Sequence, residues 1–258
     1  MKLRGPISFL LFGLLYINAI LAQADKKLVL GEQPIFSVSR THEQITIDGR
    51  KDEVIWEKTE AGNFDHYYRA EHPDDRQQTI FRMLWDEKNL YVLFEMKDKY
   101  LTARETKRDG APYFDDCAEV FFITAPDSLN IHFGYELNLY KAANDFIYFN
   151  RYYQEKDVVY KAFNPEYSVE TSSSGTINDN SDIDEGWFLE MAIPIANFGE
   201  LGQTVPVKKG NRWAFLAIRQ DRNDAEGNRR STSTLFPIYD ISKNVHQPHR
   251  FGLLEFTD

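Results

Sequence analysis

Cysteine, clusters of basic residues and helical repeats are nearly absent from this chain of 258 residues. It has one cysteine, Cys117, so no disulfide bond within the chain stabilises the fold and packing must do so. Lysine and arginine never occur in runs longer than two, and 40 acidic against 30 basic residues give a net charge of −10. We therefore expect no phosphate-binding basic surface, and no nucleic acid as a partner.

Enzyme signatures are also missing. The chain contains no glycine-rich phosphate loop, no HExxH zinc motif, no GxSxG nucleophile turn and no paired cysteines at zinc spacing. Its 14 glycines and 10 prolines are scattered, which excludes collagen-like and low-complexity classes. What is present is typical of a globular protein, with 42% hydrophobic, 27% charged and 14% aromatic residues.

The first 24 residues have the features of a cleaved secretory signal. Lys2 and Arg4 precede an apolar run over residues 7–21, and residues 22–24 (Ala-Gln-Ala) place small side chains where a signal peptidase reads them. The run is shorter than the ~20 residues of a membrane-crossing helix, so we expect no membrane span after cleavage, with a retained anchor as the alternative. No cysteine lies near the cleavage point to carry a lipid. The predicted location is secreted or periplasmic.

Short runs rich in β-branched and aromatic residues dominate the rest of the chain. Residues 45–47 lead into the turn dipeptide Asp48-Gly49, and the runs over 81–85 and 90–96 flank a polar loop, which predicts a hairpin. Further candidate strands cover residues 118–124, 133–140, 146–152, 167–171, 187–193, 213–219, 232–238 and 251–256. All four tryptophans lie in apolar patterns and are predicted to be core: Trp56, Trp85, Trp187 and Trp213.

Helical periodicity is confined to two places, residues 54–56 and the stretch directly after Pro194. We therefore predict an all-β fold, a two-sheet antiparallel β-sandwich of the jelly-roll kind with short helical turns. Residues 25–44 are expected to form an N-terminal leader or edge segment, and residues 45–258 a single domain.

Several motifs occur in one order between residues 45 and 254. They are ITIDGRKDEVIW (45–56), LWD (84–86) with NLYV (89–92), DCAEVF (116–121), GWFLE (186–190) before Ile193-Pro194, the strand at 213–219, and PHRFGLL (248–254). This ordered set resembles family 9 carbohydrate-binding modules and their relatives. The resemblance implies a β-sandwich that binds sugars, often beside polysaccharide-degrading enzymes, with structural calcium in some members.

The resemblance also implies where a sugar ring is held. In this family a pair of tryptophans clamps the ring, because an aromatic face desolvates the apolar C–H face of a sugar. The first clamp position corresponds to Tyr113, followed by Phe114, after a turn sequence. The second position has no tryptophan in this chain. His246 is the candidate there, with Tyr239 and Phe236 as alternatives.

Polar contacts follow from the same resemblance. Glu119 matches a family acid that accepts hydrogen bonds from sugar hydroxyls. Asn138 and Arg219 lie on strands equivalent to those that supply the remaining contacts. Their registers are ambiguous by one residue, and a shift of one would turn either side chain to the other face of the sheet.

Calcium is the expected cofactor, although sugar binding does not require it. Asp221, Asn223, Asp224 and Glu226 concentrate oxygen ligands in one turn, and calcium takes six to eight oxygens. Residues 178–182 form a similar stretch. Neither has the spacing of an EF-hand loop, so solvated acidic loops are the alternative.

These observations predict a secreted, non-catalytic protein that binds a poly- or oligosaccharide by aromatic stacking and polar contacts to hydroxyls. Its expected setting is polysaccharide catabolism, with a glycan-degrading enzyme as a partner. Two alternatives stay open. Carboxylates near Glu119, which could meet Glu136 or Glu190 across a sheet, could cleave glycosidic bonds. A haem-binding electron-transfer domain of similar fold would use a methionine with a histidine or lysine as axial ligands, although no CxxCH motif occurs.

Overall fold

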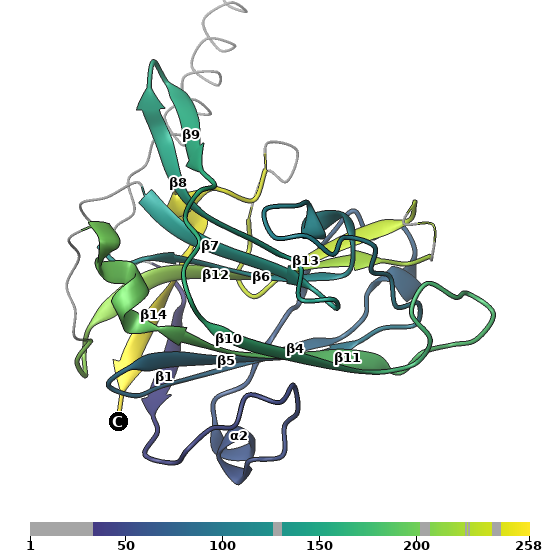
Figure 1. The fold of residues 1–258 in the computed structure, drawn as a ribbon, viewed down its shortest axis with the longest axis horizontal. Coiled ribbons are helices and arrows are strands. Elements are labelled where there is room, and N and C mark those ends of the chain that lie inside the picture. Colours follow the sequence, from purple (N-terminus) through teal and green to yellow (C-terminus); the bar gives the residue numbers. More distant parts are fainter. Residues whose placement is uncertain (1–32, 126–130, 202–206, 225, 227, 239–243) are drawn as a thin grey trace, which may run out of the picture.

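The computed structural model describes residues 33–125, 131–201, 207–224, 226, 228–238 and 244–258. The predicted signal segment and Tyr239 lie outside the described residues. Within them the regular structure is almost entirely β-strand, and the strands lie in two facing layers (Figure 1). No helix of the described part is both long enough and apolar enough to cross a membrane.

The strands belong to one 14-stranded sheet. Its main path runs in the order β10-β11-β5-β4-β1-β14-β12-β6-β7-β8-β9. The bounds along that path are Ser168–Ser174, Gly186–Pro194, Asn89–Lys97, Thr79–Trp85, Ile35–Arg40, Gly252–Thr257, Arg212–Arg222, Cys117–Ile123, Ile131–Asn138, Ala143–Tyr153 and Lys156–Tyr160. Three shorter strands pair beside the path: β2 (Gly62–Asn63), β3 (His66–Tyr68) and β13 (Arg230–Thr234).

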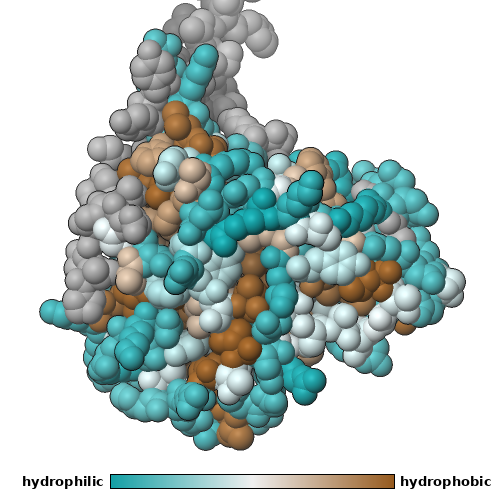
Figure 2. Space-filling view, viewed as in Figure 1, coloured by the Kyte–Doolittle hydropathy of each residue, from teal (hydrophilic) through white to brown (hydrophobic). Residues whose placement is uncertain are grey.

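The two arms of this path face each other and enclose the core, so the predicted sandwich is confirmed (Figure 1). Phe81 of β4 stacks on Phe215 of β12 across the layers, with ring centroids 6.0 Å apart. The four tryptophans are buried as predicted, none more than 3% exposed. Hydrophilic residues cover most of the face shown in Figure 2, and hydrophobic ones are visible there only in small patches.

Local predictions for the hairpin and the helical turns are confirmed. β4 and β5 pair antiparallel around the polar loop at residues 86–88. The helix α2 (Val54–Lys58) and the 3-10 helix η3 (Ile195–Leu201) occupy the two places where helical turns were expected. Gly49 has φ of 77°, the left-handed conformation that the Asp-Gly turn requires.

The strand predicted at residues 45–47 is wrong. The N–H groups of Asp48 and Gly49 donate to the carboxylate of Glu190 at 3.0 and 3.1 Å, and the N–H of Thr46 donates to Glu53 at 2.8 Å. Side-chain oxygens therefore satisfy backbone groups that would otherwise need a neighbouring strand. The other oxygen of Glu190 accepts the indole N–H of Trp56 on α2 at 3.0 Å, so both of its oxygens are engaged here.

The leader predicted at residues 25–44 also needs correction, because residues 35–40 form the inner strand β1. This strand pairs in parallel with both β14 and β4, whereas the other pairs of the main path are antiparallel. Phe36 and Val38 alternate into the core at 3% and 0% exposure. β1 thus joins the two layers instead of lying at an edge.

The layer that contains β12, β6, β7 and β8 carries the site. Every residue of β6 is buried, so this strand is covered on both faces. One face packs on the opposite layer. The other is covered by the 3-10 helix η2 (Pro112–Phe114) and by the segment around His246, whose ring stacks on Phe121 at 4.9 Å. A cavity lies between these two covers.

Candidate functional site

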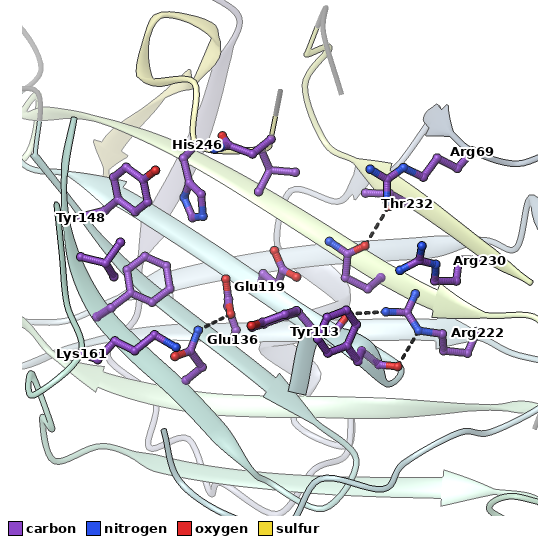
Figure 3. A pocket seen from close by; sticks show the side chains of 17 residues that line it. Arg69, Tyr113, Glu119, Glu136, Tyr148, Lys161, Arg222, Arg230, Thr232 and His246 are labelled. Carbon is purple, nitrogen blue, oxygen red and sulfur yellow. Dashed lines mark hydrogen bonds between the residues drawn. The ribbon is translucent and has the colours of Figure 1, made fainter. Parts of the chain in front are cut away.

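Four of the six predicted sugar-binding residues line one cavity of about 320 Å³ (Figure 3). They are Tyr113, Phe114, Glu119 and His246. The volume falls at the small end of the ~300–1,000 Å³ typical of ligand pockets. The structure thus brings together residues that lie up to 133 positions apart in the sequence.

A larger hollow of about 800 Å³ lies elsewhere, beside Arg108 and Lys141. Its two cations already have partners, because Arg108 forms an ion pair with Asp145, and Lys141 one with Glu170 at 2.8 Å. The 320 Å³ cavity contains four of the predicted residues, one of which is the buried carboxyl group of Glu119, and we take it as the candidate site.

The floor of the cavity is a pair of carboxyl groups. Glu119 of β6 and Glu136 of β7 stand opposite each other in the antiparallel register, and they are 1% and 4% exposed. Asn144, opposite Glu136 on β8, donates its side-chain amide to Glu136 Oε2 at 2.6 Å. Neither oxygen of Glu119 has a partner at hydrogen-bond distance among the described residues, although the side chain of Gln220 lies close enough to lower its pKa.

Burial changes the protonation of this pair. It raises the pKa of Glu119 to about 7, and the side chain of Gln220 offsets part of the increase. Burial also raises the pKa of Glu136 well above its ordinary value, and the nearby charge of Glu119 adds to the effect. Two buried carboxyl groups side by side cannot both ionise readily, so the floor retains a proton at neutral pH.

One wall of the cavity is the aromatic pair Tyr113 and Phe114 on η2. Their ring centroids are 4.8 Å apart, and Phe114 is 56% exposed. The guanidinium of the buried Arg222 donates to the backbone carbonyl of Phe114 at 2.6 Å and to that of Tyr113. Burial raises the pKa of Tyr113, and the charges of Glu136 and Glu119 raise it further.

The second wall is a stack of rings on the other side of the carboxyl pair (Figure 3). The rings of Tyr148 and His246 are 4.2 Å apart with planes inclined by 17°. His246 Nδ1 lies 2.9 Å from His132 Nε2, a hydrogen bond that fixes the ring. Burial lowers the pKa of His246 to about 4, so the ring is neutral at pH 7 and presents an uncharged face.

Arg219 does not reach the cavity, and Gln220 does. Arg219 points between the layers, where it donates to the carbonyl of Lys97 at 2.7 Å and to Asp98 at 3.0 Å. Side chains alternate along β12, so Gln220 lies on the cavity face with Glu119. The prediction for Arg219 is corrected by one residue, the ambiguity of register that the sequence left open.

Asn138 likewise lies outside the cavity lining. Its side-chain amide donates to the carbonyl of Glu105 and to Asp115 Oδ2, both at 2.8 Å. Its Oδ1 accepts the N–H groups of Tyr140 and Ala142. All of the hydrogen-bonding groups of the Asn138 side chain are thus used within the fold. A buried structural role replaces the predicted sugar contact.

The predicted metal ligands separate in the structure. The carboxylate of Asp224 accepts the N–H groups of Asn228 and Arg229 within its own loop. Glu226 is exposed and accepts a hydrogen bond from Asn180 at 3.2 Å. Asn223 is buried and faces Gln77, with an O–N distance of 3.5 Å.

Asp221 instead joins Asp98 and Asp116. Their ligand oxygens lie within 4.8 Å of one another, and all three residues are at most 2% exposed. The cation in contact with them is Arg219, which lies 3.0 Å from Asp98 and 3.2 Å from Asp221. Burial raises the pKa of all three aspartates in spite of the nearby guanidinium, and oxygen ligands suit a hard cation such as calcium.

Some cavity residues were not predicted from the sequence. Tyr148 and Asn144 lie on β8, where alternation with Phe146 would have placed them on one face of the strand. Gly134 leaves room for the ring of Phe146, because a Cβ at this position would lie 2.2 Å from that ring. Arg222 gives no sequence signal, since its role depends on carbonyls of residues 113 and 114, more than one hundred positions away.

Comparison with known proteins connects this site to one family. The family model described as "Carbohydrate family 9 binding domain-like" matches residues 47–258. A search of curated proteins finds no match.

Solved structures show the same fold. A carbohydrate binding module family 9 from Caldicellulosiruptor kristjanssonii in complex with cellotriose is 20% identical, covers 86% of this chain and 93% of its own, and has a TM-score of 0.59. A carbohydrate binding module family 9 from the same organism in complex with glucose is 19% identical. The match covers 86% of this chain and 95% of the module, with a TM-score of 0.58. A protein from Bacteroides uniformis ATCC 8492, described as a carbohydrate-binding protein, is 16% identical. The match covers 87% of this chain and 100% of that protein, with a TM-score of 0.64.

The carboxyl floor makes a prediction about pH and stability. The folded-state pKa of Glu119 is about 7 against an ordinary 4.5, so the native state holds a proton that the unfolded chain releases. Stability from this proton is lost as pH rises through 7, and Glu119→Gln, which is always neutral, avoids the loss. We measure the free energy of unfolding of both proteins by urea denaturation at pH 5 and at pH 8.5. The value for the variant minus the value for the unmutated protein should be about 3 kcal/mol larger at pH 8.5 than at pH 5.

The matched control is Glu60→Gln, which removes an exposed carboxyl far from the cavity. It should show no such change between the two pH values. A Glu119→Gln difference that is equal at pH 5 and pH 8.5 would contradict a protonated floor.

Proposed function

We propose that this chain, which belongs to the carbohydrate family 9 binding domain-like family, is a non-catalytic protein that binds a sugar in the cavity above Glu119. The observation that carries the proposal is Glu119 itself. It is 1% exposed, and its two oxygens lack hydrogen-bond partners within the described chain. A buried acceptor without a partner costs about 1–3 kcal/mol, and sugar hydroxyls are donors that remove this cost.

The aromatic walls complete the recognition of a sugar ring. Tyr113 presents a partly buried ring on one side of the floor, and His246 with Tyr148 presents stacked rings on the other. These rings stand in for the tryptophan pair of the family, because any flat aromatic face can desolvate the C–H face of a sugar. Two neighbours in the structure comparison hold cellotriose and glucose, which supports a sugar as the ligand.

The arrangement of the carboxyl groups favours binding over hydrolysis. Glycosidases place two carboxyl groups on either side of the bond that is cleaved. Here Glu119 and Glu136 lie side by side on adjacent strands and together form one side of the cavity. They approach a bound ring from one side only, which suits hydrogen bonds to hydroxyls.

We further propose that the protein is exported and takes part in polysaccharide breakdown beside a glycan-degrading enzyme. Support for export comes from the basic, apolar and small-residue pattern of residues 1–24. An exported binding protein without enzyme signatures depends on another protein for cleavage of the glycan.

We also propose that Asp98, Asp116 and Asp221 hold a calcium ion that stabilises the fold. Support comes from three buried carboxylates that converge within 4.8 Å. Asp221 Oδ1 has no hydrogen-bond partner among the described residues, although Arg219 lies 3.2 Å away as an ion pair. The cluster ties β12 to the ends of β5 and β6, so a cation there would stabilise the sandwich near the cavity.

Removal of the Tyr113 ring should weaken binding without unfolding the protein. Tyr113→Ala loses a stacking surface but keeps the backbone carbonyl that Arg222 contacts. We expect an affinity loss of about 1–3 kcal/mol for the tightest glycan found on an array, measured by calorimetry, with an unchanged Tm. Tyr140→Ala, which removes a 43% exposed tyrosine outside the cavity, is the control. Loss of folding with unchanged affinity per folded molecule would show that Tyr113 is core.

Calcium should stabilise the protein by a free energy that increases with the logarithm of its concentration above the Kd. After treatment with EDTA, addition of calcium at about one hundred times its Kd should add about 2.7 kcal/mol of stability, seen as a rise in Tm. Asp116→Asn should lose most of the rise, and Asp65→Asn, at an exposed position, should keep it. A Tm that is the same after EDTA treatment and after addition of calcium would refute the site.

Export makes a separate prediction. Mass spectrometry of the protein secreted or released from the periplasm should give a mature N-terminus at Asp25. An intact Met1 on protein that stays inside the cell would contradict export.

A further inference from the structure

Basic side chains gather around the rim of the cavity, although the protein has a net charge of −10. Arg69, Arg222 and Arg230 lie together at one end, and Lys161 lies at the other end near Glu136 (Figure 3). Among the residues that the structure describes, Glu119 and Glu136 are the only acids that line the cavity, and both are on its floor. The rim is therefore locally positive.

The three arginines come from the ends of three neighbouring strands. Arg222 ends β12 and Arg230 begins β13, and the register places them opposite each other. Arg69 directly follows β3, which pairs with β13. Burial lowers the pKa of Arg222 and the charge of Arg230 lowers it further, while Asp116 opposes both. Like charges opposite each other destabilise an antiparallel pair, so the fold retains an unfavourable arrangement at this place.

The exposed arginines of this group have no acidic partner in the described chain, whereas Lys161 lies near Glu136. The side chains of Arg69, Lys161 and Arg230 form no ion pair and no hydrogen bond within the described part of the chain. Lys141, by contrast, forms an ion pair with Glu170 at 2.8 Å. Free guanidinium donors thus stand at the mouth of a cavity whose floor already fits a sugar.

We propose that the cavity selects an anionic sugar, one that carries a carboxylate or a sulfate ester, and that the exposed Arg69 and Arg230 bind this oxyanion, with the buried charge of Arg222 behind them. The inference rests on the proposed function, since it names the class of sugar for the same site. A guanidinium can donate two parallel N–H bonds to the oxygens of a carboxylate or sulfate. The ring lies over Glu119 beside Tyr113, and its charged group points to the arginine end.

The acidic floor is compatible with an anionic ligand. Burial raises the pKa of both Glu119 and Glu136, so the pair holds at least one proton at neutral pH. A protonated carboxyl group is itself a donor, which can meet a hydroxyl or ring oxygen of the sugar. Repulsion from the floor is thereby reduced while the positive rim stays charged.

Calorimetry with glucose, glucuronic acid and glucose 6-sulfate, together with an array of matched neutral and acidic glycans, tests this inference. We expect at least one acidic glycan to bind about tenfold or more tightly than its neutral counterpart in 50 mM NaCl. The preference should shrink at 500 mM NaCl, because salt screens exposed charges. Stronger binding of the sulfate or of the uronate identifies which source supplies the oxyanion, and either supports the proposal.

Variants separate the rim from the rest of the surface. Arg69→Gln and Arg230→Gln should each lower the affinity for the acidic glycan about five- to tenfold and reduce its preference over the neutral one. Arg76→Gln, at an exposed arginine outside the cavity, should change neither. All three positions are exposed, so a Tm equal to that of the unmutated protein confirms that folding is intact.

The outcomes distinguish the two proposals. Equal or tighter binding of the neutral glycans, lost in Tyr113→Ala, overturns the anionic-sugar inference and leaves the sugar-binding function standing. A preference for acidic glycans that survives both rim variants also overturns the role of the arginines. No binding to any glycan overturns the proposed function, and the inference with it.

Discussion

The burial of two carboxyl groups side by side is the constraint on which the site depends. Pairing of β6 with β7 sets Glu119 opposite Glu136, and covers on both faces of β6 remove these groups from water. Desolvation makes the ionised pair costly, which is why the pKa of both groups rises. Glu119 is left without a hydrogen bond among the described residues. A polyhydroxylated ligand supplies the missing donors, so the same burial that weakens the empty protein favours binding.

The walls stand on groups that are fixed by the fold. Buried Arg222 holds the carbonyls of Tyr113 and Phe114, and His132 holds His246 by a ring-to-ring hydrogen bond. Two preorganised aromatic faces lose little side-chain entropy when a ring binds between them, which suits recognition of a ligand with weakly polar faces.

Much of the fold could be predicted from local pattern, and the site only in part. The alternation of apolar and polar residues, together with turn residues, located most of the strands. Both signals are local, because each depends on residues that lie close together in the sequence. The role of Arg219 was missed because register along β12 is a matter of one residue, and only pairing with β6 determines it. Residues 45–47 failed as a strand because Glu190, far away in sequence, takes the backbone donors that follow them. The arginine rim likewise forms only when β12, β13 and β3 pair.

A crystal structure of the protein with its tightest glycan tests the central claim most directly. The account predicts a sugar ring against Tyr113, with a hydroxyl within hydrogen-bond distance of Glu119 and with His246 and Tyr148 on the far side of the carboxyl pair. A glycan bound elsewhere, such as in the hollow beside Arg108 and Lys141, with Glu119 still uncontacted, would contradict it.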